Sequence, residues 1–520
     1  MRILNQRIFD ENARKNKIFP VFKEIIADTL TPVATFLKLQ KDRKHIYLLE
    51  SIEGNSNIGR YSFIGLDSHI IFKAKKNEIT IINVNDPEQN VDKKYSLNPI
   101  VELENLVKEI DSGLRINLDL PPFYGGAVGY IGYNSVCYFE KSLKKVIELK
   151  NKDESFDFED MYFVFPKDII IFDRVKNTIT IASNILVSDN KNKDYDLGIQ
   201  RIKDIENEVF LNNNKNIELL ECVKNQKKEL KIDIKQSHSK NAYEEMVLKA
   251  KDYIKKGDIF QIVLSQRWEI DYKNGNEQNE ISDFDIYRYL RVMNPSPYMF
   301  FLKFDDFSII GASPESLAKR MNDKVILRPI AGTRKRSVNY EIDKALEIEL
   351  LNDEKEKAEH IMLLDLGRND IGRIAKKGTV KVDEYMTIER YSHVMHIVSQ
   401  VGCEVEKETK FADIMKAVFP AGTVSGAPKI RAIEIINELE NINRGIYAGS
   451  IVYLGFNQNF DSCITLRTIL KKGNKIFIQA GAGIVADSDP ETEYFETVNK
   501  AKVLFEAVAK TLNIDEFKLK

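Results

Sequence analysis

The strongest constraint on the fold is a series of short β-rich runs between about Lys44 and Ala182. HIYLLES, EITIINV, DIIIFDR and TITIAS are rich in β-branched and aromatic residues, and Asn, Asp and Gly separate them. Short runs of this composition, bounded by turn-forming residues, are typical of strands joined by hairpins. This part of the chain therefore predicts a largely antiparallel, β-rich lobe.

The sequence changes character after this lobe. Residues 187–240 are rich in Asn, Lys and Glu and contain one amphipathic pattern, near Ile199 to Phe210, which favours a surface connector. Residues 241–520 begin with a helical pattern, NAYEEMVLKAKDYIKKGD, that ends at Gly257, and the strand-like IFQIVLSQRWEI follows. We predict an α+β chain with lobes at 1–186 and 241–520, joined by the connector at 187–240.

Composition limits the possible partners. The 77 Lys and Arg residues nearly equal the 79 Asp and Glu residues, so the overall charge attracts neither nucleic acid nor an anionic membrane. The amino end lacks an apolar signal-like run, and no apolar run approaches the ~20 residues of a spanning helix. We expect a cytoplasmic protein whose four cysteines form no disulfide framework or zinc site: Cys137, Cys222, Cys403 and Cys463.

Two acidic segments are candidates for a metal site. NDEKEKAEHIMLLDLGRND predicts a helix ended by Gly367, with Glu356 and Glu359 on one face. A solvated acidic face explains this helix equally well. Mg²⁺ prefers oxygen ligands and commonly bridges one or two carboxylates to an anionic substrate, so a second carboxylate source would favour a metal site.

The second source is AGAGIVADSDPETEYFETVNKAKVLFEAV. We predict a turn at Gly481 to Gly483 and then a helix on which Glu496 and Lys500 lie one turn apart. By itself, such a spacing is typical of a surface ion pair. The apolar stripe of this helix is expected to face the core, and it consists of Phe495, Val498 and Phe505.

Cations and polar loops predict an anion site. ILRPIAGTRKR places four cations around a glycine, where the backbone N–H groups of Gly332 and Thr333 could bind an anion without bulk. Arg467 lies in the strand-like CITLRTIL, although any one arginine taken alone is more simply a surface charge. PAGTVSGAPKIRAIEIINEL predicts a polar loop containing Thr423, with Pro428 opening a helix that could receive a carboxylate.

Together these segments resemble the chorismate-utilising enzymes, and most closely the anthranilate synthase component I family. The match runs in order through LLES, GRYSFIGL, GDIFQIVLSQR, NPSPYMFFL, GASPES, PIAGT, AEHIMLLDLGRNDIGR, HVMHIVSQV, PAGTVSGAPKIRA and GAGIVADSDPETEYFETVNKA. The resemblance implies a central antiparallel β-sandwich flanked by helices, with chorismate and Mg²⁺ bound in a cleft.

The resemblance also implies roles for particular residues. Glu359 and Glu496 would bind the metal, Glu315 would protonate the departing C4 hydroxyl, and His396 would serve the later loss of pyruvate. Thr423 joins this catalytic group. The implied chorismate-binding residues are Gly332, Thr333, Tyr447, Arg467, Gly481, Ala482, Gly483 and Lys500.

Two positions distinguish reactions within the family. Gln261 stands where relatives that add water carry a lysine base, so its neutral amide argues against that chemistry. Ala331 stands where aminodeoxychorismate synthases generally read PIKGT, with a lysine that attacks the ring at C2. A small residue leaves room for ammonia itself, so the resemblance predicts anthranilate and pyruvate as products, in tryptophan biosynthesis.

A partner and an inhibitor follow from the same resemblance. The chain has no glutaminase segment with a nucleophile elbow, so a separate glutamine amidotransferase subunit is expected to supply ammonia. The family's tryptophan pocket matches Ser51, Pro297, Tyr298 and Met299, which implies allosteric feedback inhibition by tryptophan. Without the resemblance, both segments would be interpreted as core strands.

Other interpretations remain at this point. An aminodeoxychorismate synthase that works without the lysine is disfavoured by Ala331 together with the intact LLES and PSPYM segments. An inactive tryptophan-binding regulatory subunit is disfavoured by the presence of the proposed acidic residues. Nucleic-acid binding through Arg334 to Arg336 lacks a wider basic face. Three departures from the family pattern, none at a proposed metal or acid position, are Asn134, Val452 and Leu466.

Overall fold

The structure is a computed structural model, and it describes residues 2–52, 59–84, 91–111, 120–148, 156–211, 220, 231–273, 281–391 and 394–517. Cys222 and much of the predicted connector lie outside the described residues. Within them, no helix is both long enough and apolar enough to cross a membrane.

Antiparallel strands dominate the described chain, and every named strand pairing is antiparallel. The strands are β1 (Arg2–Ile3), β2 (Ile18–Ile26), β3 (Ile46–Glu50), β4 (Tyr61–Lys75), β5 (Glu78–Asn83), β6 (Val91–Tyr95), β7 (Gly126–Ile131), β8 (Met161–Asp173), β9 (Thr178–Leu186), β10 (Lys231–Gln236), β11 (Gln261–Lys273), β12 (Tyr298–Phe304), β13 (Phe307–Ser313), β14 (Ser316–Met321), β15 (Lys324–Leu327), β16 (Ile330–Lys335), β17 (Lys381–Arg390), β18 (Val394–Glu404), β19 (Gly426–Ala427), β20 (Ser450–Gly455), β21 (Phe460–Ile464), β22 (Thr468–Lys472) and β23 (Lys475–Ile484).

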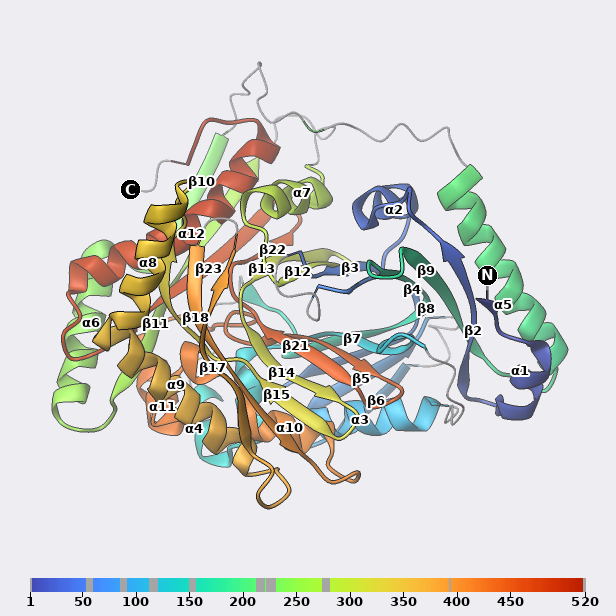
Figure 1. Ribbon diagram of the computed structural model, residues 1–520, viewed down its shortest axis with the longest axis horizontal. Coiled ribbons are helices and arrows are strands. Elements are labelled where there is room, and N and C mark those ends of the chain that lie inside the picture. The colour runs from blue at the N-terminus through green and yellow to red at the C-terminus, as the bar shows by residue number, and fades with distance from the viewer. Residues whose placement is uncertain are drawn as a thin grey trace.

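Helices flank these strands (Figure 1). They are α1 (Gln6–Asn12), α2 (Pro32–Leu39), α3 (Pro99–Ile110), α4 (Lys141–Glu148), α5 (Lys191–Glu206), α6 (Lys240–Lys255), α7 (Asp283–Met293), α8 (Tyr340–Asn352), α9 (Glu354–Gly372), α10 (Phe411–Val418), α11 (Lys429–Leu439) and α12 (Pro490–Leu512). Shorter helical turns are η1 (Tyr133–Tyr138), η3 (Asn207–Leu211) and η4 (Gly422–Val424).

The strands form two layers that branch from the long pair β4 and β8. One layer continues from β4 through β3, β12, β13, β22, β23 and β11. The other continues from β8 through β7, β20, β21, β14, β15 and β18. The predicted α+β class and antiparallel sandwich are therefore confirmed.

Alternating side chains on the first layer build two cores, as the two-residue period of a strand requires. Phe300 and Leu302 of β12 point into the core between the layers, together with Val128 and Ile451 of the second layer. Phe301, the residue between them, joins the core beneath α2, α7 and α12. A smaller core lies where α6 and α11 cover the ends of β11 and β23.

The two predicted lobes share these layers. β3, from the first lobe, pairs with β12, and β7 pairs with β20. Both large cores contain residues from each side of the predicted boundary at residue 186, so that boundary separates no core in the described chain. The predicted domain bounds thus mark changes in sequence composition, and both large cores extend across residue 186.

Some local expectations were confirmed and others were wrong. In α6 the predicted residues Tyr243, Met246 and Ala250 are buried, and Gly257 follows the helix with a φ of +80°. The connector helix α5 begins at Lys191, before the predicted Ile199. Gly367 does not end its helix, because α9 continues to Gly372.

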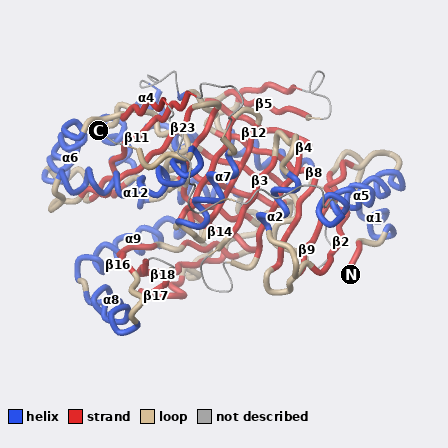
Figure 2. The backbone as a smooth tube through the Cα atoms, turned by 90° about the horizontal axis from the view of Figure 1, so that it is seen from above, coloured by secondary structure: helices blue, strands red, loops and turns tan. Residues whose placement is uncertain are grey.

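Figure 2 shows two separate groups of helices in the part of the chain after residue 239. α6 and α12 lie beside β11 and β23, whereas α8 and α9 lie with β16, β17 and β18. Antiparallel pairing joins β16 and β17 to β18. The candidate site takes residues from both groups.

Candidate active site

An inner cavity of about 270 Å³ collects most of the predicted site residues. Its volume is close to the lower end of the usual range for small-molecule sites, about 300–1,000 Å³. The predicted residues that line it are Glu315, Thr333, Glu359, His396, Thr423, Tyr447, Arg467, Gly481, Gly483 and Lys500. Segments far apart in sequence therefore converge on one enclosure.

Three predicted residues take other places. The side chain of Ala482 is fully buried in the core under α6 and α11, on the opposite face of β23 from Gly481 and Gly483. Glu496 lines an outer groove of about 670 Å³ that shares Arg467 and Lys500 with the inner cavity. Gly332 lies within β16 beside Thr333, at an irregularity in the pairing with β18.

Glu315 is the carboxyl group best suited to act as an acid. It lies between β13 and β14, and the hydroxyl of Thr423 in η4 donates a hydrogen bond to its Oε1 at 2.9 Å. Burial raises the pKa of Glu315 to about 7, although Thr423 and the charge of Lys500 oppose the rise. A carboxyl group with this pKa can hold a proton near neutrality and give it to a leaving group.

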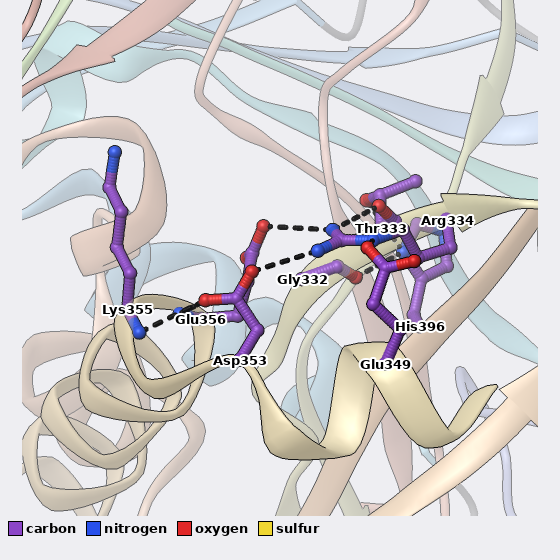
Figure 3. A network of polar contacts seen from close by, with 8 residues as sticks. All are labelled: Gly332, Thr333, Arg334, Glu349, Asp353, Lys355, Glu356 and His396. Atoms are coloured by element: carbon purple, nitrogen blue, oxygen red, sulfur yellow. Dashed lines mark hydrogen bonds and ion pairs between the residues drawn. The ribbon is translucent and has the colours of Figure 1, made fainter. Parts of the chain in front are cut away.

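His396 of β18 is held by the irregular strand β16 (Figure 3). Its Nδ1 lies 3.0 Å from the carbonyl oxygen of Gly332 and 3.0 Å from Oγ1 of Thr333. A carbonyl can only accept, so we assign the hydrogen to Nδ1, which leaves Nε2 as the acceptor nitrogen. Burial lowers the pKa of His396, and the neutral ring is therefore favoured.

Arg467 and Lys500 supply positive charge to the inner cavity. Burial lowers the pKa of Arg467, whose Nη1 makes a long contact of 3.4 Å with the amide oxygen of Asn294. Among the described residues no carboxylate pairs with Arg467. Lys500 pairs with Glu496 at 2.6 Å and donates to the carbonyl oxygen of Gly481 at 3.1 Å. A buried cation facing a cavity without a carboxylate partner favours an anionic ligand.

The expectation for the Arg467 segment was partly wrong. CITLRTIL is not one strand, because β21 ends at Ile464 and β22 begins at Thr468. Arg467 lies between them with a φ of +46°, a left-handed conformation that is uncommon outside glycine. The connection ends one strand and turns the guanidinium toward the cavity wall.

The predicted turn at Gly481 to Gly483 was also wrong, since these residues continue β23 and pair with β11. Their small size has another cause. A Cβ at Gly481 would lie 2.7 Å from Oη of Tyr447 and 2.8 Å from the carbonyl oxygen of Leu264. Glycine is therefore required by close approach, and it leaves the backbone open to the cavity.

Carboxylates gather on α9 and α12. Burial raises the pKa of Glu359, and the nearby charges of Glu356 and Glu496 raise it further. Burial also raises the pKa of Glu493, whose Oε2 is buried without a hydrogen-bond partner. Like charges held together in this way are a suitable setting for a cation.

Figure 3 shows that Glu356 is also held by Arg334. The Arg334 guanidinium pairs with Glu349 at 3.0 Å, Asp353 at 2.8 Å and Glu356 at 3.3 Å, and it donates to the Thr333 carbonyl oxygen at 3.1 Å. One arginine thus joins β16 to α8 and α9. The three arginines of this segment, Arg328, Arg334 and Arg336, pair with the protein's own carboxylates.

The helix that carries Glu496 differs from expectation on one face. Phe505 of the predicted apolar stripe is buried and Val498 is partly buried, but Phe495 is 46% exposed. The ammonium of Lys240 lies 4.9 Å from the Phe495 ring centroid. Phe495 belongs to the wall of the outer groove instead of the core.

Sequence reasoning missed Gln479. It lines the inner cavity from β23, two residues before Gly481 on the same face of the strand. Its Nε2 donates to Oγ of Ser265 at 2.8 Å, and its Oε1 is buried without a hydrogen-bond partner. The alternation of residues 479, 481 and 483 along one strand was the available signal, and the predicted turn concealed it.

A second cavity of about 720 Å³ contains the predicted regulatory residues Ser51, Pro297, Tyr298 and Met299. Apolar and polar groups line it together. Oη of Tyr298 donates to Asp461 at 3.1 Å, and Asp461 pairs with Lys319 at 3.1 Å. The structure thus brings these two distant segments to one cavity, as the family resemblance implied.

The fold and the inner cavity define an enzyme class with a small enclosed site, between two β layers, where an acid and two cations meet. The family of chorismate binding enzymes matches residues 44–506. The chain therefore belongs to the chorismate binding enzymes.

Similar proteins narrow this class. The chain is 44% identical to anthranilate synthase component 1 of Acetivibrio thermocellus over 95% of its length and 96% of the relative. It is 43% identical to the Aquifex aeolicus protein of the same name, over 94% of each chain.

Among solved structures, anthranilate synthase component I of Streptococcus pneumoniae aligns with a TM-score of 0.70 and 36% identity, over 92% of this chain and 98% of that one. The menaquinone-specific isochorismate synthase of Escherichia coli has a TM-score of 0.67 at 17% identity, over 98% of each chain. This last likeness shows a shared fold alone.

Proposed function

We propose that the chain is the aminating subunit of an anthranilate synthase, which converts chorismate and ammonia to anthranilate and pyruvate. The observation that carries the proposal is the Glu315 carboxyl group, with its pKa of about 7, in one cavity with the cations of Arg467 and Lys500. Chorismate brings two carboxylates and a hydroxyl leaving group. An enclosed acid beside cations suits both features.

In the first step the nitrogen of ammonia bonds to C2 of the ring while the C4–O bond breaks. Glu315 gives its proton to the departing oxygen, which leaves as water, and the ring double bonds shift between these atoms. The hydrogen bond from Thr423 fixes the carboxyl group during this transfer. Ammonia loses one proton after attack, so the step is balanced.

In the second step the C2 hydrogen and the enolpyruvyl group leave, which makes the ring aromatic. The free Nε2 of neutral His396 is an acceptor for the C2 proton, and the contact of Nδ1 with Gly332 fixes the ring. The C3–O bond breaks, and enolpyruvate leaves and tautomerises to pyruvate. Anthranilate then retains the nitrogen.

The choice of nucleophile rests on two small or neutral side chains. Gln261 and Ala331 both line the inner cavity. Gln261 is only 7% exposed and carries an amide that cannot act as the base that a water-adding enzyme needs. Ala331 offers no amine to attack C2, so free ammonia is the nucleophile that this cavity accepts.

The residues present fit a Mg²⁺ ion. Glu359 and Glu496 would hold it, and Glu493, whose buried Oε2 has no hydrogen-bond partner, would add negative charge beside them. Within the described residues no three ligand side chains converge closely enough to enclose a cation by themselves. Mg²⁺ would supply positive charge for a substrate carboxylate that supplies further oxygen ligands.

A partner subunit is part of the proposal. Component 1 proteins imply a second component, and we infer a glutamine amidotransferase that releases ammonia from glutamine. Free ammonium salts would replace the partner at a lower efficiency. Ammonium-dependent activity without glutamine use by the isolated chain would support this division of labour.

Feedback inhibition by tryptophan is the proposed role of the second cavity. Pro297 and Met299 provide apolar surface for an indole ring, while Lys319 and Asp461 provide opposite charges for an amino acid's carboxylate and ammonium. Glu50 at the cavity wall is fully enclosed and pairs with Arg174 and Arg291. The mixture of apolar surface and paired charges suits an aromatic zwitterion.

The test is to mix the purified chain with chorismate, Mg²⁺ and ammonium at mildly alkaline pH, with and without tryptophan. Anthranilate fluorescence and chorismate loss are followed together. Equal rates of both, suppressed by tryptophan, are expected. Chorismate loss with an aminodeoxychorismate product would contradict the proposal, and tryptophan binding without any conversion would favour an inactive regulatory subunit.

A further inference from the structure

A fully buried ion pair lies directly behind the inner cavity. Glu440, at the end of α11, and Arg444, in the following loop, are each only 1% exposed at the side chain. Two parallel contacts join them, Nη2 to Oε1 at 2.6 Å and Nε to Oε2 at 2.9 Å. This forked geometry fixes the relative orientation of the two side chains.

The remaining hydrogen bonds of Arg444 reach two separate walls of the cavity. Its Nη1 donates to the carbonyl oxygen of Val424 at 2.8 Å, and its Nη2 donates to the carbonyl oxygen of Val263 at 2.7 Å. Val263 belongs to β11, and Val424 follows Thr423 in η4. Both valines line the cavity.

Glu440 holds the same strand from its other side. Its Oε1 accepts from the backbone N–H of Ser265 at 2.7 Å and from the Ser265 hydroxyl at 2.9 Å. A serine hydroxyl has one hydrogen, so Oγ must accept from Nε2 of Gln479 at 2.8 Å. Glu440 is therefore connected to β23 through the side chains of Ser265 and Gln479.

Arg444 also fixes the segment that carries Tyr447. Its own carbonyl oxygen accepts from the Tyr447 N–H at 3.0 Å, and its guanidinium carbon lies 5.6 Å from the Tyr447 ring centroid. The ring of Tyr133 lies 4.7 Å from the same carbon. Four segments that line the cavity thus meet at one buried fork.

We propose that the Glu440–Arg444 pair is the positioning device of the reaction: it fixes η4, β11, β23 and Tyr447 relative to one another, so that Thr423 meets Glu315. The proposal rests on the proposed function and adds residues that touch neither substrate nor metal. Well-packed apolar residues could fill the same volume, but they would leave the carbonyls of Val263 and Val424 without donors.

The main test is Arg444→Lys. Lysine keeps a positive charge beside Glu440, but it lacks the planar guanidinium group that donates to Val263 and Val424 at the same time. We expect kcat to fall about 100-fold, because small misplacements of catalytic groups have effects of that order. KM for chorismate stays within about threefold, because the two cations that face the substrate, Arg467 and Lys500, make no direct contact with Glu440 or Arg444. Circular dichroism and the thermal midpoint establish that the variant is folded.

The matched control is Arg201→Lys. Arg201 of α5 pairs with the buried Asp168 at 2.6 Å, away from the inner cavity, so the chemical change is the same and the place is different. Its kcat is expected to match that of the unmodified chain. A folded Arg444→Lys variant with the kcat of this control would overturn the proposal.

A double variant tests whether Arg444 works through Thr423. In a Thr423→Val background, Arg444→Lys is expected to lower kcat by less than about tenfold, because part of its effect is already absent. The proposal would be overturned if the kcat of the double variant were reduced by the full product of the two single-variant reductions. If Arg444→Lys fails to fold, Ser265→Ala replaces it, because the Ser265 hydroxyl links Glu440 to Gln479. We expect a kcat at least about fivefold lower, and an unchanged kcat would overturn the proposal.

Chorismate loss and product identity are recorded separately for every variant. A product other than anthranilate would contradict the proposed function, whereas the ratio of variant to unmodified rates of chorismate loss tests the positioning role. A chain that consumes no chorismate under any of these conditions would contradict both.

Discussion

Glu315 is the residue on which the chemistry depends. Its position between two strands removes it from bulk water, and Thr423 and Lys500 moderate the resulting rise in pKa. Glu315→Gln keeps the size of the side chain but cannot give a proton to the C4 oxygen. We expect kcat to fall by at least about 100-fold with a much smaller change in KM, measured by anthranilate fluorescence.

The same residue sets the expected pH dependence. Glu315 must be protonated and has a pKa of about 7, so kcat/KM measured at constant free ammonia should fall as the pH rises above about 7. His396 must be neutral and has a lowered pKa, so the acid limb should lie below its ordinary value of about 6.5. A residual Glu315→Gln activity that kept the alkaline limb would assign this limb to another group.

The sequence and its family resemblance predicted many of the site residues, but not the buried residues behind the site. The family resemblance located Glu315 and His396, whereas the residue patterns themselves indicated Arg467 and the carboxylates of two helices, and the structure brings most of these residues to one cavity. The sequence did not indicate Arg444, because NELENINRG has the composition of a solvated surface turn. Burial depends on contacts distant in sequence, and local composition carries little information about them.

At the scale of elements, β23 shows why glycine-rich sequence is ambiguous. AGAG predicts a turn from propensity, yet here each glycine admits a neighbour that approaches an extended strand. Gly367 also lies inside an element, α9, but there a Cβ would meet only Leu327 at 3.7 Å, an ordinary contact, so packing does not require this glycine. In β23, by contrast, close packing and not a turn explains the glycines.

The two strand glycines give a matched pair of variants. In Gly481→Ala the new Cβ meets Oη of Tyr447 and the carbonyl oxygen of Leu264 below 3.0 Å, whereas in Gly483→Ala it meets the mobile end of Gln261 at 3.0 Å. We expect Gly481→Ala to lower stability by about 1–3 kcal/mol, as overpacking does, and to raise KM for chorismate. Denaturant unfolding and steady-state kinetics measure these effects, and equal losses in both variants would contradict the steric explanation.

At the scale of the whole molecule, the sequence predicted the class of fold but not its continuity. Strand patterns are local, whereas the pairings of β3 with β12 and of β7 with β20 join segments on opposite sides of the predicted boundary. Both layers contribute residues to each of the two cavities. Tyr298 at the second cavity is paired with Ser313, two residues before Glu315.

This continuity gives the proposed regulation a physical basis. A ligand that shifts β12 also acts on β13, which ends beside the acid of the inner cavity. Ser51→Phe would fill part of the second cavity and is expected to raise the tryptophan concentration for half-maximal inhibition at least about tenfold, the effect of losing roughly 1.4 kcal/mol of binding. Each inhibited rate is compared with the uninhibited rate of the same variant. Unchanged inhibition would exclude this cavity as the tryptophan site.

Reciprocity provides the stricter test of coupling. If tryptophan lowers chorismate affinity by some factor, chorismate must lower tryptophan affinity by the same factor. Glu315→Gln makes this measurable, because it should bind chorismate with Mg²⁺ while turning over too slowly to deplete it. Calorimetric titration of tryptophan into this variant should give a weaker affinity in the presence of chorismate, by about 5–150-fold for typical coupling. Equal affinities would mean that tryptophan acts on the chemical step through the Glu315 strand, not on substrate binding.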